Sequence, residues 1–308
     1  MSAASPFFLG IDGGGTSTDL AMLAEDGSVA ARLSGETSNK SVVGFDGAVS
    51  VLTALIDQAC EIAGTSTPIA AGWVGLAGAD RPEDRAAFTE ALGSRISQLQ
   101  ITNDAELVLS GVPSGVGIAL IAGTGSIAFA RNERGETGRS GGWGHIFGDE
   151  GSAYMVAVDA LRAVAAAVDG RGPATTLIDA LLAWWEAERP QQLISRIYAE
   201  DVRKADIARS APVVVEAASA GDDVALAILN RAGDDLTDLV HSLARRIPFD
   251  EMPAVVGTGG LLLHTDLVRR RIEGRLDPSM VRPDLVVVDD IALNVAQAVR
   301  RRSQKGQS

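Results

Sequence analysis

One stretch decides the fold of this chain: Phe7-Phe8-Leu9-Gly10-Ile11-Asp12-Gly13-Gly14-Gly15-Thr16-Ser17-Thr18. Residues 7–11 are an apolar, strand-like run, and the remainder is a turn of glycines and hydroxyl side chains preceded by an acid. Glycines let backbone amides approach an anion closely, and Thr and Ser hydroxyls add donors. We therefore interpret the turn as a phosphate-binding loop, in which Asp12 could hold Mg²⁺ directly or through water.

The same pattern occurs a second time. The apolar run 117–122 ends in Gly123-Thr124-Gly125-Ser126, and each of the two turns is followed by a further strand-like segment, 20–24 or 127–131. Two such loops facing each other would hold a polyphosphate, so the repeat indicates a phosphotransferase with a duplicated core.

Two common phosphate motifs do not fit the first turn. No Gly-Lys-Ser/Thr follows it, which excludes a Walker A loop, and a strand rather than a helix follows it, which excludes a Rossmann fingerprint. A hairpin turn with surplus glycines remains the simpler alternative. A third glycine turn follows the strand 254–256; it could lie flat against a nucleotide or be a plain strand-to-helix turn. It reads Gly257-Thr258-Gly259-Gly260.

Composition limits the possible partners. The chain has 308 residues, enough for two domains, and a formal net charge of −13, which argues against nucleic acid and anionic membranes as partners. The one cysteine, Cys60, permits no disulfide within the chain. Residues 1–6 lack the features of a signal peptide, and no uninterrupted apolar run is long enough to cross a bilayer, so we expect a cytoplasmic protein.

The pattern along the chain predicts alternating strands and helices. We expect a three-stranded meander over 7–33, a helix over 47–63, strands over 70–76 and 100–103, and a glycine-rich loop over 138–148. The boundaries we expect are an N-terminal domain over 1–113, a C-terminal domain over 114–290 with an all-helical insertion over about 150–247, and a terminal helix over 291–308 that packs back on the first domain.

Asp104 is the candidate general base. It follows a predicted strand, and ligand sites in open α/β sheets collect at the carboxyl ends of strands. A carboxylate there could accept the proton of a sugar hydroxyl as it attacks phosphorus. Capping the next helix is the alternative role for this residue.

A dense stretch of glycine and polar residues precedes the helix that starts near residue 152. It holds Trp143, Gly144, Asp149 and Glu150. Carboxylates here could accept hydrogen bonds from sugar hydroxyls, or could simply favour the N-terminus of the helix. The pair Trp184-Trp185 could stack on a sugar; its alternative roles are packing in the core or forming a dimer contact.

Together these motifs resemble the N-acetylglucosamine kinase and BadF/BadG-type branch of the sugar kinase/actin-like ATPase superfamily, and within it the actinobacterial glucosamine kinases. The resemblance rests on the two phosphate turns, the third glycine turn, Thr102-Asn103-Asp104-Ala105, Gly141-Gly142-Trp143-Gly144-His145 and Gly148-Asp149-Glu150-Gly151-Ser152-Ala153-Tyr154. It implies two duplicated actin-like, ribonuclease H-like α/β domains with the helical addition in the second.

The resemblance also implies roles. The Asp12 and Gly123 turns would bind the phosphates of ATP and Mg²⁺, the Gly257 turn would bind adenosine, and Asp104 would be the base; Asn39, Asp104, Trp143 and Asp149 would contact the sugar. The expected activity is transfer of phosphate to the 6-hydroxyl of glucosamine by a homodimer, with N-acetylglucosamine kinase or a BadF-type ATPase activator as alternatives. Two departures from the family pattern are Ala77-Gly78-Ala79-Asp80, which removes a sugar-side hydroxyl, and Ile291-Ala292-Leu293-Asn294 at the start of the last helix.

Overall fold

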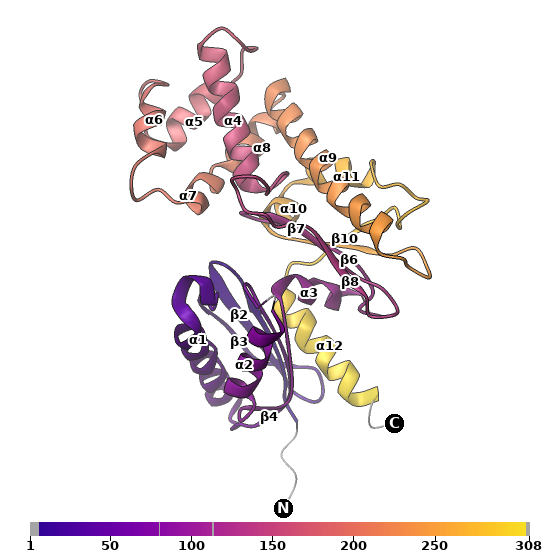
Figure 1. Ribbon diagram of the computed structural model, residues 1–308. Helices are drawn as coiled ribbons and strands as arrows, with labels where there is room; N and C mark the ends of the chain where they lie inside the picture. The colour runs from indigo at the N-terminus through magenta and orange to yellow at the C-terminus, as the bar shows by residue number, and fades with distance from the viewer. Residues whose placement is uncertain (1–5, 80, 113, 306–308) are drawn as a thin grey trace, which may run out of the picture. The chain divides into compact units, whose positions relative to one another are not determined.

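The computed structural model describes residues 6–79, 81–112 and 114–305, and the chain divides into two compact units (Figure 1). Unit 1 comprises Met1–Gly115 and Asp290–Ser308, and unit 2 comprises Val116–Asp289. The C-terminal helix thus belongs to the same unit as the first strand, although the two are separated by nearly the whole sequence.

Unit 1 is built on a five-stranded sheet in the order β3-β2-β1-β4-β5. Strands β1, β2 and β3 form an antiparallel meander, whereas β4 and β5 run parallel to β1. Three parallel strands therefore end at one edge of the sheet, where side chains following them are brought close together. The strand bounds are β1 Phe8–Gly13, β2 Ser17–Leu23, β3 Val29–Glu36, β4 Ile69–Leu76 and β5 Ile96–Thr102.

Helices cover both faces of this sheet. Leu9 and Ile11 point to one face and share a core with residues of α1 (Lys40–Ala63) and α2 (Pro82–Leu92). Gly10 points to the other face, where α12 (Ile291–Lys305) packs so closely that a Cβ at Gly10 would lie 2.1 Å from the Ala292 carbonyl oxygen. The departure Ile291-Ala292-Leu293-Asn294 thus still allows close packing, because glycine on β1 and alanine on α12 meet.

Helix α1 is long and largely apolar. Among the described helices, it alone is long and apolar enough to cross a membrane by length and composition. Its inner residues, including Leu52 and Ile56, are buried against the sheet of unit 1. The helix begins earlier than predicted, at Lys40, with non-helical dihedral angles at Gly44 inside it.

Unit 2 repeats the sheet of unit 1. Its order is β10-β9-β6-β7-β8, with β6, β7 and β8 antiparallel and with β9 and β10 parallel to β6. Read from β8, this is the same succession of neighbours and directions as in unit 1, so the predicted duplicated α/β fold is confirmed. The bounds are β6 Gly117–Ala122, β7 Ser126–Arg131, β8 Thr137–Gly141, β9 Val255–Thr258 and β10 Leu285–Val287.

Several helices between β8 and β9 form the helical addition of unit 2, whereas unit 1 has α1 alone in the corresponding connection between β3 and β4 (Figure 1). The longest, α9, buries Leu229, Leu236 and Val240 in one core with Ile118 and Leu120 of the sheet. The addition comprises α4 Ala153–Val168, α5 Leu177–Trp184, α6 Gln192–Ile197, α7 Lys204–Ala208, α8 Ala211–Ser219 and α9 Asp223–Arg246; α10 Gly260–His264 and α11 Asp266–Glu273 follow β9.

One local prediction was wrong. Residues 137–141, expected to be mostly part of a glycine-rich loop, form the edge strand β8 paired with β7. The segment is Thr-Gly-Arg-Ser-Gly and lacks the apolar alternation that identifies a strand, because an edge strand with exposed side chains does not need it.

Candidate functional site

Asp12 lies at the carboxyl end of β1. The register places it opposite Asp19 on β2 and beside Gly75 on β4. Asp12 and Asp19 are both half-buried. Burial first, and then the carboxylates of Asp104 and Asp19, raise the pKa of Asp12 to about 7, against the opposing effect of the Arg32 guanidinium. Ionisation of Asp12 is therefore disfavoured by its acidic neighbours, and a bound cation would offset that repulsion.

The first glycine turn, residues 13–18, is fixed at both ends and open at its tip. The Gly14 amide donates to the Ser17 carbonyl at 2.9 Å, and the Thr18 hydroxyl donates to the buried Ser38 hydroxyl at 2.9 Å. Within the described part of the chain, the amides of Gly15 and Thr16 donate to no protein acceptor. Two adjacent amides at a turn tip are suited to an anion.

Asp104 is the first residue of α3 (Asp104–Val108), directly after β5. Asn103 is the N-cap of this helix and accepts a hydrogen bond from the Glu106 amide at 2.9 Å, so capping does not account for Asp104. The Asp104 carboxylate accepts from the Ala105 amide at 3.0 Å and acts electrostatically on Asp12. The structure therefore brings the two predicted acidic residues together at one edge of the unit 1 sheet.

Asn39 has a structural role that the sequence analysis did not assign. It is the N-cap of α1 and accepts a hydrogen bond from the Ser41 amide at 2.9 Å. A Cβ at Gly78 would lie 3.0 Å from the Asn39 side-chain oxygen, so the segment after β4 approaches this residue closely. Sugar contact by Asn39 stays a prediction, and Asp80 lies outside the described residues.

The second glycine turn, residues 123–126, has the same construction. The Gly123 amide donates to the Gly125 carbonyl at 3.0 Å, and the amides of Thr124 and Gly125 donate to no acceptor among the described residues. Ser126 is different, because its hydroxyl donates to the Glu150 carbonyl at 2.6 Å and its amide to Asp149. Ser126 therefore anchors the turn, and its amide does not point to solvent.

The third glycine turn, residues 257–260, packs directly on the second. Gly259 has a φ of +99°, and a Cβ there would lie 2.5 Å from the Ala122 carbonyl oxygen. The Thr258 hydroxyl is held by the Val288 carbonyl at 2.7 Å. Since β6 and β9 are parallel neighbours, the two turns share one edge of the unit 2 sheet, as a bipartite nucleotide site requires.

Trp143 belongs to a loop of exposed apolar side chains. Trp143, Ile146 and Phe147 are 57%, 86% and 70% exposed, and the Arg139 guanidinium lies 4.8 Å from the centre of the Trp143 ring. Gly144 has a φ of +80°, a conformation that L side chains rarely adopt. The loop begins beside the second glycine turn, because the Gly142 amide donates to the Ser126 carbonyl at 3.0 Å.

Neither Asp149 nor Glu150 caps the helix that follows. Ser152 is the N-cap of α4, accepting from the Met155 amide at 3.3 Å. Asp149 is 4% exposed and its carboxylate is ion-paired with Lys204. Its sugar contact stays a prediction, whereas its contact with the second glycine turn is a finding.

Magnesium fits the donor chemistry of unit 1. Mg²⁺ is usually held by one or two carboxylates together with substrate phosphates and water. Asp12 and Asp19 supply carboxylates beside the first glycine turn, although the described residues contain no group of three or more His, Cys, Asp or Glu arranged to hold a metal by themselves. Such a site would be completed by the phosphates.

Two charged residues were missed by the sequence analysis. The partner of Asp12, Asp19, follows from the hairpin register and could have been found by pairing the two strands across the turn. The partner of Asp149, Lys204, lies 55 positions away on the helical addition, and no local pattern marks it.

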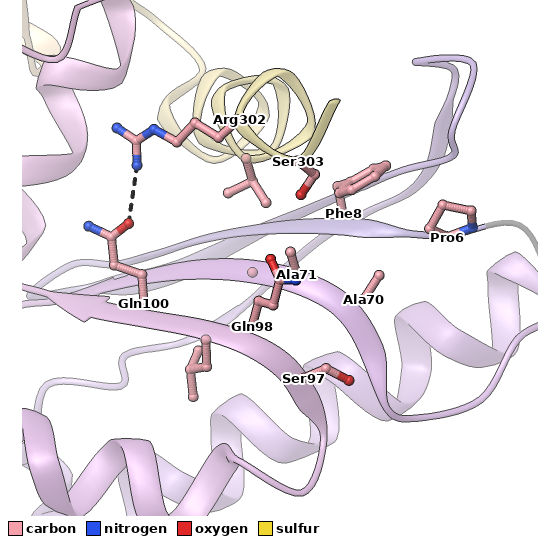
Figure 2. A pocket seen from close by; sticks show the side chains of 12 residues that line it. Pro6, Phe8, Ala70, Ala71, Ser97, Gln98, Gln100, Arg302 and Ser303 are labelled. Atoms are coloured by element: carbon pink, nitrogen blue, oxygen red, sulfur yellow. Dashed lines mark hydrogen bonds between the residues drawn. The ribbon is translucent and has the colours of Figure 1, made fainter. Parts of the chain in front are cut away.

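Unit 1 also contains a cavity of about 590 Å³ that is separate from the predicted site (Figure 2). It is lined by the beginnings of β1, β4 and β5 and by α12, from which Arg302 reaches Gln100 at 3.1 Å. None of the described residues lining it belongs to the predicted site. It lies at the amino ends of the parallel strands, opposite the edge where Asp12 and Asp104 meet.

Comparison with known proteins gives a consistent assignment. A model of the BadF/BadG/BcrA/BcrD ATPase family matches residues 9–280. An N-acetylmuramic acid/N-acetylglucosamine kinase of Clostridium acetobutylicum is 34% identical, covering 82% of this chain and 84% of that protein. An N-acetyl-D-glucosamine kinase of Dictyostelium discoideum is 33% identical over 86% and 89%, and the glucosamine kinase GspK of Vibrio cholerae is 26% identical over 78% and 83%.

Solved structures agree with the fold. A candidate N-acetylglucosamine kinase from Chromobacterium violaceum is 27% identical, with a TM-score of 0.70 over 96% of this chain and 98% of that chain. A ROK family glucokinase from Streptomyces griseus, 18% identical, matches with a TM-score of 0.61 over 97% and 99%. The latter similarity concerns the fold alone.

Proposed function

The chain belongs to the BadF/BadG/BcrA/BcrD ATPase family, and we propose that within this family it is an ATP- and Mg²⁺-dependent kinase of amino sugars. The observation that carries the proposal is the placement of Asp104, at the carboxyl end of β5 and close enough to Asp12 to raise its pKa. A phosphotransferase needs a base for the incoming hydroxyl beside a site for charged phosphate, and this edge of unit 1 provides both.

Each set of residues has a part in the proposed reaction. Asp104 orients the 6-hydroxyl of the sugar and accepts its proton, while the tip amides of the glycine turns bind phosphate oxygens and stabilise the charge of the transferring group. Asp12 and Asp19 would hold Mg²⁺, which when bound would neutralise phosphate charge. The third glycine turn supports the adenosine.

For the sugar, we propose N-acetylglucosamine in preference to glucosamine. The two relatives above 30% identity are named for N-acetylated sugars, whereas the glucosamine kinase is 26% identical, which favours the alternative over the first expectation. The exposed Trp143, Ile146 and Phe147 add support, because an acetyl group needs an apolar surface and a free amine does not.

The alternative of an ATPase activator that bridges a metal cluster between subunits has less support. The one cysteine, Cys60, is buried in α1 and is therefore poorly placed to ligate a group shared with another chain. A homodimer is proposed from the family resemblance; Trp184, 46% exposed at the end of α5, is available for such a contact.

The test is a coupled assay of ADP release with a panel of sugars. We expect turnover with N-acetylglucosamine, a lower kcat/KM with glucosamine, and a product phosphorylated at the 6-position by NMR. A higher kcat/KM for glucosamine would reverse the substrate assignment, and no turnover with any amino sugar would remove the kinase proposal.

A further inference from the structure

The segment that follows the Trp143 loop forms hydrogen bonds with the last residue of the second glycine turn. Asp149 adopts a φ of +61°, and its Oδ1 accepts a hydrogen bond from the Ser126 amide at 3.2 Å. The neighbouring Glu150 carbonyl accepts from the Ser126 hydroxyl at 2.6 Å. The Asp149 carboxylate therefore helps to fix the position of Ser126, the last residue of the turn.

That carboxylate depends on Lys204. Asp149 is 4% exposed, and a buried carboxylate without a counter-ion is strongly disfavoured. Lys204, the first residue of α7, supplies the counter-ion through its ammonium, which pairs with Asp149 Oδ2. The same ammonium lies 5.7 Å from the centre of the Tyr154 ring on α4, which restricts its position further.

The ammonium also reaches the turn itself. A Cβ at Gly125 would lie 2.8 Å from Asp149 Oδ1 and 3.2 Å from Lys204 Nζ, so glycine is needed to let the ion pair approach the backbone. The Lys204 side chain is 29% exposed, so it is not sealed from solvent. The Lys204 ammonium thus stands beside Gly125, one of the two residues whose amides form the tip of the turn.

We propose that Lys204 is a positioning residue of the nucleotide site: it holds Asp149, and through it the second glycine turn, and it contributes positive charge where the polyphosphate binds. The inference rests on the proposed ATP-dependent function. It assigns a role in phosphate binding to α7 of the helical addition, an element that unit 1 lacks.

A comparison of Lys204→Met, Lys204→Arg and Arg209→Met tests this. Arg209 follows the same short helix and pairs with Asp206 at 2.7 Å, so its replacement removes an ion pair without touching the turn. For each purified chain, calorimetry measures the Kd of a nonhydrolysable ATP analogue and of adenosine, and initial rates give KM for ATP and for the sugar.

We expect Lys204→Met to raise the Kd of the ATP analogue and the KM for ATP about tenfold or more, as expected when a charge-assisted contact is lost. The Kd of adenosine, which carries no phosphate, should change less than about twofold. Lys204→Arg should restore most of the phosphate-dependent affinity because it keeps the charge, and Arg209→Met should behave as wild type.

Several results would overturn the inference. An equal loss of affinity for adenosine and for the ATP analogue would mean that Lys204 only supports the fold. An unchanged Kd of the ATP analogue in Lys204→Met would show that Lys204 has no role in nucleotide binding, and it would leave the proposed kinase function standing. If Lys204→Met does not fold, Lys204→Gln, which can still donate to Asp149 without charge, is measured in its place against the same criteria. No nucleotide binding by the wild-type chain would overturn the proposed function and this inference together.

Discussion

The two hairpins that open the two sheets have the same connections but opposite chemistry before the turn. We compare the second cross-strand pair counted from each turn. In unit 1 it joins Asp12 and Asp19, and in unit 2 it joins Ile121 and Ile127. All four side chains are half-buried. Placing like charges opposite each other is destabilising, so the acidic pair of unit 1 is not explained by folding, whereas the isoleucine pair is.

The turns themselves are more alike than the strands. Each leaves two tip amides without a protein acceptor in the described chain, at Gly15 and Thr16 in unit 1 and at Thr124 and Gly125 in unit 2. We therefore propose a division of roles: both turns would offer amides to phosphate, and the hairpin of unit 1 would also offer the carboxylates of Asp12 and Asp19 to a metal ion.

The largest expected effect tests the acidic edge of unit 1. Asp104→Asn keeps the size of the side chain but removes the base, and we expect kcat to fall by ~10²-fold or more while nucleotide affinity is retained. Steady-state kinetics and titration with an ATP analogue measure the two quantities separately. Turnover close to wild type would remove Asp104 from the role and leave unit 1 without its proposed distinction.

A second prediction compares the glycines of both turns. A Cβ at Gly13 would lie 2.4 Å from Ser38 Oγ, and one at Gly125 would lie 2.8 Å from Asp149 Oδ1. We expect Gly13→Ala and Gly125→Ala to lower the free energy of unfolding by ~1–3 kcal/mol, because a methyl group is forced into packed atoms.

The matched variants are Gly15→Ala and Gly123→Ala, where a Cβ would meet nothing within 4 Å. These should change stability by less than about 0.5 kcal/mol, yet weaken ATP binding about tenfold if phosphate approaches the backbone there. Thermal melts and ATP titrations separate the two effects. Unchanged ATP affinity in one of this pair would show that its turn does not contact phosphate.

The doubled pattern of strand, glycine turn and strand was enough to predict the duplicated fold, because alternation and turn chemistry are local. Local patterns were also enough to predict that Asp12 and Asp104 each stand at the end of a strand. The strand β8 could not be predicted, since an exposed edge with Arg139 and Ser140 has no apolar period. The pair between Asp149 and Lys204 could not be predicted either, because an ion pair across 55 positions depends on tertiary packing alone.

A third prediction concerns charge in unit 1. The pKa of Asp12 is raised to about 7, so between pH 4 and 7 the folded chain binds more protons than the unfolded one, and stability falls as pH rises. In nucleotide-free protein with EDTA, Asp12→Asn should therefore be more stable than wild type by ~1–3 kcal/mol at pH 8, a difference that vanishes near pH 4.

Urea unfolding at a series of pH values measures this difference. Ile121→Asp in unit 2 is the converse variant, and it should lower stability as pH rises, because it introduces a half-buried carboxylate into the isoleucine pair. A difference between wild type and Asp12→Asn that does not depend on pH would contradict the account of the acidic pair.

The smallest effect is expected at Asp222, which belongs to neither glycine turn. This N-cap of α9 accepts hydrogen bonds from the Ala225 amide at 2.9 Å and from the amide and hydroxyl of Thr176 at 2.6 and 2.8 Å. Burial acts to raise its pKa, but these bonds and one from Thr175 outweigh it and lower the pKa to about 2.

Asp222→Ala should lower the free energy of unfolding by ~1–2 kcal/mol at pH 7, as the loss of a helix cap does. Because the folded pKa lies below the unfolded one, the contribution is present above about pH 4 and is lost as pH falls through 2. Asp223→Ala, one residue on and exposed, is the matched control, and neither variant should change KM for ATP more than about twofold. A change in KM for ATP with Asp222→Ala alone would mean that the packing of α9 influences the nucleotide turn, so that the stability of the addition and the phosphate site of unit 2 could not be treated as separate.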